Sequence, residues 1–190
     1  MSKIKKAIKD PKIALQYVRT RATGYWYKFW YTLTNKRVRI GSNFHVDGRL
    51  SIKGPGRVVI GDNVRIGMYT TPWTFKEDAI IRIGNNVFLN GTRFACANSI
   101  TVGDKSMLAD CRVMDTSFHS EDPRYRHGFY DTPTPIVIGK NTWITIGSVV
   151  LKGSNIGENS ILAPNSVMAG KMLPNKVYMG NPARAVKALQ

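Results

Sequence analysis

Aliphatic side chains recur at every sixth position through most of this 190-residue chain. The longest uninterrupted series keeps one phase over six hexads and consists of Ile138, Ile144, Val150, Ile156, Leu162 and Met168. The same phase is present upstream, at Ile60, Ile66, Ile83, Leu89, Val102, Leu108 and Met114. A period of six matches neither the 3.6-residue repeat of an α-helix nor plain alternation along extended strands. The pattern therefore predicts short strands separated by regular corners.

The residues between the aliphatic positions predict how the corners are made. Glycine often follows the aliphatic residue and asparagine stands two positions further on, as in the sequence IGEN at 156–159. Both residue types tolerate the left-handed backbone of a tight turn. Three hexads would close a triangular coil, and stacked coils would bury the aliphatic side chains as one column. A sandwich of unrelated strands would not keep one phase for so long. We expect an all-β fold, a parallel β-helix over residues 40–181.

The chain outside residues 40–181 has a different composition. Residues 1–39 contain eleven Lys and Arg against one acid, Asp10, and many aromatic residues lie between Tyr17 and Tyr31. The spacing predicts a short helical segment with two compatible interpretations. It could cap the β-helix, or lie as an amphipathic segment on an anionic membrane surface. Residues 182–190 are predicted to form a short C-terminal helix or tail.

Charge and cysteine content narrow the class of protein. With 28 Lys and Arg against 12 Asp and Glu, the formal net charge is +16. Such a charge favours a polyanionic partner: nucleic acid, an anionic membrane or a phosphate-bearing substrate. Cys96 and Cys111 stand in unrelated contexts, so we expect reduced, buried thiols. Because no apolar run could span a membrane and the basic N-terminus lacks the apolar core of a signal peptide, an intracellular protein is expected.

The repeat stops after Met114, just before a histidine. Two insertions are predicted as loops, at about 70–79 and 120–135, and inserted loops often carry the function of a solenoid. His119 lies at the start of the second insertion, four residues after Asp115. A neutral imidazole can take a proton from a hydroxyl at neutral pH, and a carboxylate or carbonyl at its other nitrogen would fix the tautomer. His119 is thus a candidate general base oriented by Asp115, against the simpler interpretation of a structural histidine.

The repeated I-G-x-N-x-x phrase and the ending YMGNPARAVKAL resemble the hexapeptide-repeat acyltransferases. Within that superfamily the chain is most similar to O-acetyltransferases of sugars and polysaccharides, including galactoside and maltose acetyltransferases. The likeness covers about residues 40–190. It implies a left-handed β-helix, an exception to the usual right-handed crossover. It also implies a homotrimer that binds acetyl-CoA between neighbouring subunits, without a metal, and it makes His119 the general base.

The resemblance assigns further residues near the transferred group. Asn90, in VFLNGT, matches the asparagine that holds the acceptor hydroxyl, although it could equally be a corner asparagine with left-handed backbone. Trp143, in NTWITIG, would lie near the acetyl group and the acceptor. The backbone N–H of Ile146 would stabilise the oxyanion. Side-chain help from the family's serine is lost, because Thr145 and Ile146 stand where Gly and Ser are usual.

Two polar stretches are assigned to the substrates. The sequence RYRHGFY at 124–130 offers cations and aromatic faces to a saccharide, or else is merely a solvated loop. Its candidate binding residues are Arg124, Tyr125, Arg126 and Tyr130. The C-terminal part resembles the edge of the family that binds pantetheine and nucleotide, and its coenzyme contacts would be Trp143, Pro164, Ala169, Arg184 and Lys187. The last two would meet the coenzyme phosphates, or else form a solvated helix face.

These residues predict an acetyl-CoA-dependent O-acetyltransferase that works by direct transfer. His119 would remove the proton of the acceptor hydroxyl as the oxygen attacks the thioester, and no serine or cysteine triad is visible for a covalent intermediate. We expect the acceptor to be a saccharide, either a polysaccharide or a lipid-linked oligosaccharide precursor. The basic N-terminus places the expected reaction at the cytoplasmic face of the inner membrane, with peripheral contact to anionic lipid.

Other functions fit the sequence less well. Amino groups of nucleotide sugars and hydroxyls of antibiotics are rival acceptors that the sequence does not separate. A zinc enzyme of the γ-carbonic anhydrase type shares the fold but needs three histidines, and the chain's three (His45, His119 and His127) lack the close pair of that family. A non-enzymatic nucleic-acid binder would explain the charge but not His119 or Trp143. We therefore expect neither a metal nor a nucleic-acid partner.

Overall fold

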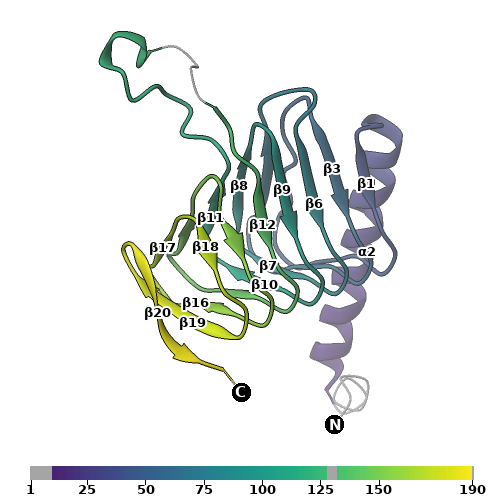
Figure 1. Ribbon diagram of the computed structural model, residues 1–190. Coiled ribbons are helices and arrows are strands. Elements are labelled where there is room, and N and C mark those ends of the chain that lie inside the picture. Colours follow the sequence, from purple (N-terminus) through teal and green to yellow (C-terminus); the bar gives the residue numbers. More distant parts are fainter. Residues whose placement is uncertain (1–9, 128–131, 190) are drawn as a thin grey trace.

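The computed structural model describes residues 10–127 and 132–189, and most of them form a β-solenoid (Figure 1). Over the described residues the strands make three sheets, of seven, eight and five strands. Successive strands along the chain pass to the three sheets in turn, so each coil has three sides and about seven coils stack. The strands that follow one another through the coils pair in parallel, so the predicted parallel β-helix is confirmed.

Each sheet takes one strand from each coil it crosses. The seven-stranded sheet contains β1 (Val38–Ile40), β3 (Arg57–Ile60), β6 (Ile80–Ile83), β9 (Ser99–Val102), β12 (Ile136–Ile138), β15 (Asn155–Ile156) and β18 (Lys171–Met172). The eight-stranded sheet contains β2 (His45–Val46), β4 (Arg65–Ile66), β7 (Phe88–Asn90), β10 (Met107–Ala109), β13 (Trp143–Ile144), β16 (Ile161–Leu162), β19 (Lys176–Gly180) and β20 (Ala183–Ala188). The five-stranded sheet contains β5 (Thr71–Thr74), β8 (Arg93–Cys96), β11 (Arg112–Met114), β14 (Val149–Val150) and β17 (Val167–Met168).

The strand register confirms the six-residue aliphatic phase except at Met114. In β11 the residue that points into the core is Val113, and Met114 is only partly buried. In the seven-stranded sheet, pairing aligns one buried column, made of Ile60, Ile83, Val102, Ile138, Ile156 and Met172. In the eight-stranded sheet a second buried column consists of Ile66, Leu89, Leu108, Ile144 and Leu162. Burial of each such side chain stabilises the fold by about 1.5–3 kcal/mol. A single coil could not bury its own column, so the coils depend on their neighbours.

The corner between the seven-stranded and eight-stranded sheets is built as the sequence predicts. One residue in each coil has a left-handed backbone there, with φ between +51° and +62°, and these residues are Asn43, Asn63, Asn86, Lys105, Asn141, Asn159 and Asn175. Several of the asparagine side chains also bond one another from coil to coil. Asn141 Nδ2 donates to Asn159 Oδ1 at 3.0 Å, and Asn159 Nδ2 donates to Asn175 Oδ1 at 3.1 Å.

Helix α2 (Pro11–Thr34) covers the first coil and is longer than the short segment expected (Figure 1). It begins after Asp10, whose side chain accepts from the Lys12 N–H, with a proline in its first turn. Its inner face meets the solenoid closely, because Gly24 lies against the Phe44 carbonyl with no room for a Cβ atom. The Tyr31 hydroxyl accepts from the Ile52 N–H at 3.1 Å. Helix α2 therefore packs on the first coil, as the capping interpretation predicts.

No helix in the described part of the chain is long and apolar enough to cross a membrane.

The predicted C-terminal helix is wrong. Residues Ala183–Ala188 form β20, which pairs antiparallel with β19. The last coil would otherwise leave one edge of β19 without backbone partners, and β20 supplies them.

The predicted loop at 70–79 is also wrong in its first half. Residues Thr71–Thr74 form β5, which pairs with β8, and Pro72 and Thr74 point into the core where an aliphatic residue was expected. The six-residue pattern missed this strand because proline and threonine fill its buried positions. The second insertion does leave the solenoid, between β11 and β12, and carries one 3-10 turn, η1 (Pro123–Tyr125), away from the coils (Figure 1).

Candidate active site

The second insertion starts from a buried carboxylate. Asp115 follows β11 and is fully buried. Its two carboxylate oxygens accept from the backbone N–H groups of Ala97 (2.7 Å) and Asn98 (2.9 Å), and the Cys96 thiol lies 3.4 Å away. Its backbone oxygen accepts from the Thr134 N–H at 2.9 Å, which closes the base of the insertion. Asp115 thus fixes the point at which the chain leaves and rejoins the solenoid.

The predicted pairing of Asp115 with His119 is wrong. Within the described residues, the Asp115 carboxylate accepts hydrogen bonds from Cys96, Ala97 and Asn98 of the preceding coil. A buried carboxylate must be satisfied by donors, and two backbone N–H groups at the corner meet that need from inside the fold. Asp115 is therefore a structural anchor and not the orienting partner of the histidine.

A backbone carbonyl takes the role expected of Asp115. His119 is exposed, and its Nδ1 lies 2.8 Å from the carbonyl oxygen of Arg126 across the insertion. The backbone N–H of His119 donates to the Ser117 carbonyl at 2.8 Å. Since a carbonyl can only accept, Nδ1 of a neutral imidazole carries the hydrogen and Nε2 is the basic nitrogen. The insertion thus presents a histidine whose tautomer suits proton abstraction.

Three aromatic rings, which we call the aromatic shelf, lie at the corner of His119: Trp73, Phe75 and Phe118. Trp73 stacks on Phe75 at a centroid distance of 4.8 Å, and Phe75 meets the edge of Phe118 at 4.7 Å. The Lys53 ammonium lies 5.1 Å from the Trp73 ring, which is 44% exposed. Sequence reasoning missed this cluster, although the aromatic residues of the 70–79 segment were its visible signal. An exposed indole beside a cation can stack on a sugar ring or hold a polar ligand.

The candidate acceptor residues of the insertion are only partly available to a ligand. The Arg124 guanidinium is held by the Asp122 carboxylate, with contacts of 2.5 to 3.1 Å, and this pairing lowers the pKa of Asp122. Tyr125 is 51% exposed, and the Arg124 guanidinium carbon lies 5.4 Å from the centroid of its ring. Arg126 supplies the carbonyl that orients His119 and is itself exposed. Tyr130, the fourth candidate, lies outside the described residues.

Asn90, Trp143 and Ile146 belong to a different part of the coil. Asn90 ends β7, and the left-handed residue of its corner is Gly91, with φ +82°. The interpretation of Asn90 as a left-handed corner residue is therefore wrong. Trp143 points outward from β13 and is 44% exposed. Ile146 lies at the next corner and is 56% exposed, and its carbonyl accepts from the Asn165 N–H.

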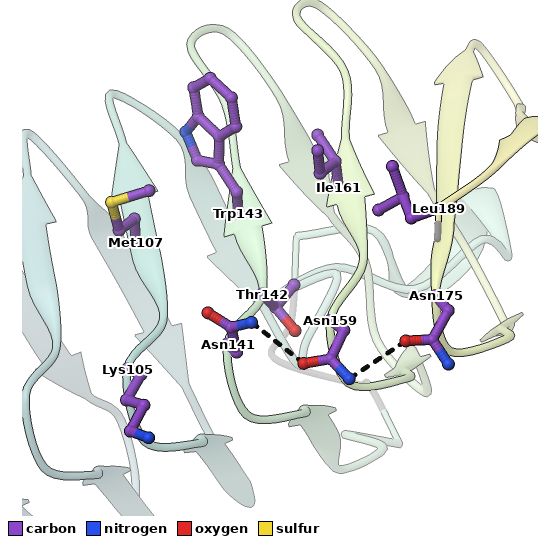
Figure 2. Close-up of a pocket in the computed structure, with 9 residues that line it drawn as sticks. All are labelled: Lys105, Met107, Asn141, Thr142, Trp143, Asn159, Ile161, Asn175 and Leu189. Atoms are coloured by element: carbon purple, nitrogen blue, oxygen red, sulfur yellow. Dashed lines mark hydrogen bonds between the residues drawn. The ribbon is translucent and has the colours of Figure 1, made fainter.

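Trp143 stands in a groove of about 470 Å³ on the outer surface of the eight-stranded sheet (Figure 2). Strand pairing places Met107 on one side of the indole and Ile161 on the other. Below this apolar row run the bonded amides of Asn141, Asn159 and Asn175, and the pocket also includes Lys105, Thr142 and Leu189 (Figure 2). Such a groove offers an elongated ligand apolar contacts along one side and hydrogen-bonding amides along the other.

The candidate coenzyme residues are spread over three places. Pro164 is exposed at the corner that also holds Ile146. Ala169 follows β17 at the corner between the five-stranded and seven-stranded sheets, the corner from which the His119 insertion leaves. Arg184 and Lys187 are exposed on β20. Because β20 is a strand, the alternative of a solvated helix face is wrong for these two cations.

One chain does not bring all of these residues together. His119 follows the corner between the five-stranded and seven-stranded sheets, whereas Trp143 lies on the eight-stranded sheet. In a three-sided coil that corner is the one that does not border the eight-stranded sheet. The described chain therefore presents the candidate base on one corner and the groove of Trp143 on the opposite face.

Both thiols are unsuited to attack. Burial raises the pKa of Cys111 to about 12, and burial together with the Asp115 charge raises the pKa of Cys96 well above its usual range. Among residues 10–127 and 132–189, no three or more His, Cys, Asp and Glu side chains are grouped to hold a metal ion.

Known proteins share this pattern. Residues 135–170 match the family described as bacterial transferase hexapeptide (six repeats). Over 129 residues, 67% of this chain and 63% of the relative, the chain is 30% identical to a Staphylococcus aureus protein named provisionally as an acetyltransferase. The chain belongs to the hexapeptide-repeat transferase family. Escherichia coli galactoside O-acetyltransferase is another relative, 27% identical over 131 residues, which are 68% of this chain and 63% of that protein. The chain thus spans less than two thirds of the length of these relatives.

Solved structures of acyltransferases share the fold. A point mutant of the N-acyltransferase AntD from Bacillus cereus, in complex with dTDP-4-amino-4,6-dideoxyglucose and coenzyme A, superposes with a TM-score of 0.67. That match covers 80% of this chain and 83% of AntD at 21% identity. A galactoside acetyltransferase in complex with coenzyme A gives a TM-score of 0.56 at 19% identity, covering 92% of this chain and 82% of that one. Oxygen and nitrogen acceptors therefore both occur among proteins of this fold.

Proposed function

We propose that this chain is a coenzyme A-dependent acyltransferase that moves an acetyl group to a hydroxyl of a saccharide. The observation that carries the proposal is the 2.8 Å contact between His119 Nδ1 and the Arg126 carbonyl oxygen, which leaves Nε2 as the basic nitrogen. The sequence match to galactoside O-acetyltransferase supports acetyl as the group and oxygen as the acceptor atom. The coenzyme A bound in two structures of the same fold supports an acyl thioester as donor.

In the proposed reaction His119 acts as general base. Nε2 takes the proton of the acceptor hydroxyl while the hydroxyl oxygen attacks the thioester carbon. The backbone N–H of Ile146 donates to the oxyanion as the new C–O bond forms. The C–S bond then breaks, and the coenzyme thiolate leaves with the proton that His119 had taken. The enzyme is never acylated, in agreement with two thiols that stay protonated.

The proposed active form is a homotrimer with a site shared between copies. His119 of one copy would face Asn90, Trp143 and the Ile146 N–H of the next, which accounts for their separation within one chain. The coenzyme would lie between copies, along the groove of Trp143 and beside Pro164 and Ala169. Arg184 and Lys187, exposed on β20, are the cations proposed for its phosphates.

The proposed acceptor is a saccharide held at the corner of His119. The exposed face of Trp73 suits a sugar ring, and Tyr125 and Arg126 stand on the insertion above that corner. Transfer to an amino group of a nucleotide sugar is the second candidate, favoured by the fold shared with AntD. Nε2 of His119 could take a proton from either acceptor, so an experiment must distinguish the saccharide hydroxyl from the amino group.

The test is release of free thiol from acetyl-CoA by the purified protein. Acceptors would be galactosides and maltose, a dTDP-amino sugar, and a total membrane glycolipid fraction, each with and without His119→Gln. Thiol release that needs a hydroxyl-bearing saccharide and falls about 10²- to 10⁴-fold in the variant would support the proposal. Release with the amino sugar alone would replace it by N-acyl transfer. Unchanged turnover in His119→Gln would remove the proposed base.

A further inference from the structure

Helix α2 has a second apolar face that points away from the solenoid. Its most exposed apolar side chains are Leu15, Val18, Trp26, Phe29 and Leu33, with exposed fractions from 58% to 70%. Intervals of three, four, seven or eight residues place them on one side of an α-helix. The contacts with the first coil come from the other side, through Thr20, Gly24, Tyr27 and Tyr31. The apolar stripe is thus separate from the capping face.

The charges along this stripe have a single sign. Lys12, Arg19 and Trp26 are seven residues apart, so the two cations lie along the same side of the helix as the indole. Between Pro11 and Thr34 the sequence contains no Asp or Glu, and Asp10 is the sole acid before Asp47. Residues 1–9 add four lysines to the sequence.

A groove beside the stripe adds a further cation. It has a volume of about 550 Å³ and lies between α2 and the first coil, lined by Trp26, Trp30, Tyr31, Arg49 and Ser51 among others. Trp26 and Trp30 stack at 6.0 Å along its rim, and the Arg49 guanidinium lies 5.6 Å from the Tyr69 ring. Aromatic rings with one apolar and one polar side are suited to the boundary between lipid chains and headgroups.

We propose that this face of α2 docks the protein on an anionic lipid bilayer. Trp26, Phe29 and Leu33 enter the boundary between headgroups and acyl chains, and Lys12 and Arg19 meet lipid phosphates. Charge complementarity selects this occupant, because a second copy would bring the same cations against each other. The proposal rests on α2 and goes beyond the acyl transfer proposed above. Where both hold, the protein works at the cytoplasmic face of the inner membrane on a lipid-linked saccharide.

The test is co-sedimentation of the full chain with vesicles. Vesicles of phosphatidylcholine alone are compared with vesicles that also contain phosphatidylglycerol. We expect binding to the mixed vesicles that weakens with added salt, and little binding to phosphatidylcholine. Trp26→Ser combined with Phe29→Ser should lower the affinity about tenfold or more, since the two rings that enter the bilayer are lost. Lys12→Glu with Arg19→Glu should lower it at least as far, because two attractions become repulsions.

The matched control is Arg82→Glu with Lys171→Glu, two exposed cations on β6 and β18. It changes the net charge by the same amount and should stay within about twofold of wild type. Thermal unfolding verifies that each variant is folded. Equal vesicle binding by all variants, or an equal loss in the control, would overturn the proposal. So would a change in oligomeric state of the Trp26/Phe29 variant with vesicle binding intact, which would assign the face to a second copy. Thiol release with a free saccharide should survive the α2 changes, so the two proposals fail separately.

Discussion

The edge of the Phe118 ring meets Phe75 at a centroid distance of 4.7 Å, with the two ring planes 78° apart. Phe118 has φ +65°, a conformation that a bulky residue keeps only when its surroundings hold it there. Phe75 follows β5 in the second coil, which consists of β3, β4 and β5. The insertion leaves after β11 in the fourth coil, which consists of β9, β10 and β11. The ring contact therefore ties the residue before His119 to a rigid corner two coils away.

Loss of this contact should slow catalysis more than it weakens binding. In Phe75→Ala we expect kcat to fall about tenfold, because His119 is no longer held in one position, with KM for acetyl-CoA within about twofold. Steady-state thiol release measures both constants. Phe75→Leu keeps part of the apolar contact and should fall in between.

Phe118→Gly separates the ring from the backbone conformation. Glycine accepts φ +65° without strain, so the variant removes the ring while the native backbone conformation stays accessible. It should reproduce the kcat of Phe75→Ala. A Phe118→Gly enzyme as fast as wild type would show that the ring contact does not position the base.

Asp115 and His119 should behave oppositely when changed. Asp115→Asn leaves one of two buried backbone N–H groups facing an amide NH₂, and should lower the free energy of unfolding by about 1–3 kcal/mol. His119→Ala, at an exposed position, should change it by less than about 0.5 kcal/mol while abolishing most turnover. Urea unfolding followed by circular dichroism gives the first quantity. A stable Asp115→Asn protein with lost activity would restore Asp115 to the catalytic machinery.

Gly24→Ala should destabilise the protein although the same change usually favours a helix. In an exposed helix interior alanine gains about 1 kcal/mol over glycine. Here an added Cβ would lie 1.9 Å from the Phe44 carbonyl oxygen, so α2 must move off the first coil. We expect a net loss of about 1–3 kcal/mol in unfolding free energy. Ala22→Gly, on the exposed side of the same helix, should cost only the ordinary propensity of about 1 kcal/mol.

The thiols should not react with reagents in the native protein, and their ionisation should lower the free energy of unfolding at high pH. The pKa of Cys111 is raised from 9.0 to about 12 in the fold, so the unfolded chain loses its proton first. The resulting stability is fully present below pH 9 and is lost as pH rises towards 12. Unfolding midpoints should fall over that range, and less so in Cys111→Ala. A thiol reagent at neutral pH should label neither cysteine until denaturant is added, and rapid labelling of the native protein would contradict this.

The repeating coils could be predicted from the sequence, whereas the segments outside the repeat could not. Aliphatic residues at every sixth position determine the coils, because each burial site depends only on local spacing. Thr71–Thr74 was missed since proline and threonine fill its inward positions, and β20 was missed because its role is to complete an edge that exists only after folding. His119 could be found from the break in the repeat. Its partner could not, because the Arg126 carbonyl depends on how the insertion folds back.

Sharing of the site between copies is the central claim, and a mixed assembly tests it most directly. His119→Ala and Trp143→Ala are each expected to be inactive alone. Co-expressed and purified together by two different tags, they should regain activity, because some interfaces combine an intact His119 from one copy with an intact Trp143 from its neighbour. Each mixed trimer that carries both tags has one intact interface of three, which predicts about a third of wild-type thiol release. Activity no higher than that of either variant alone, in mixed trimers confirmed by mass, would contradict the shared site.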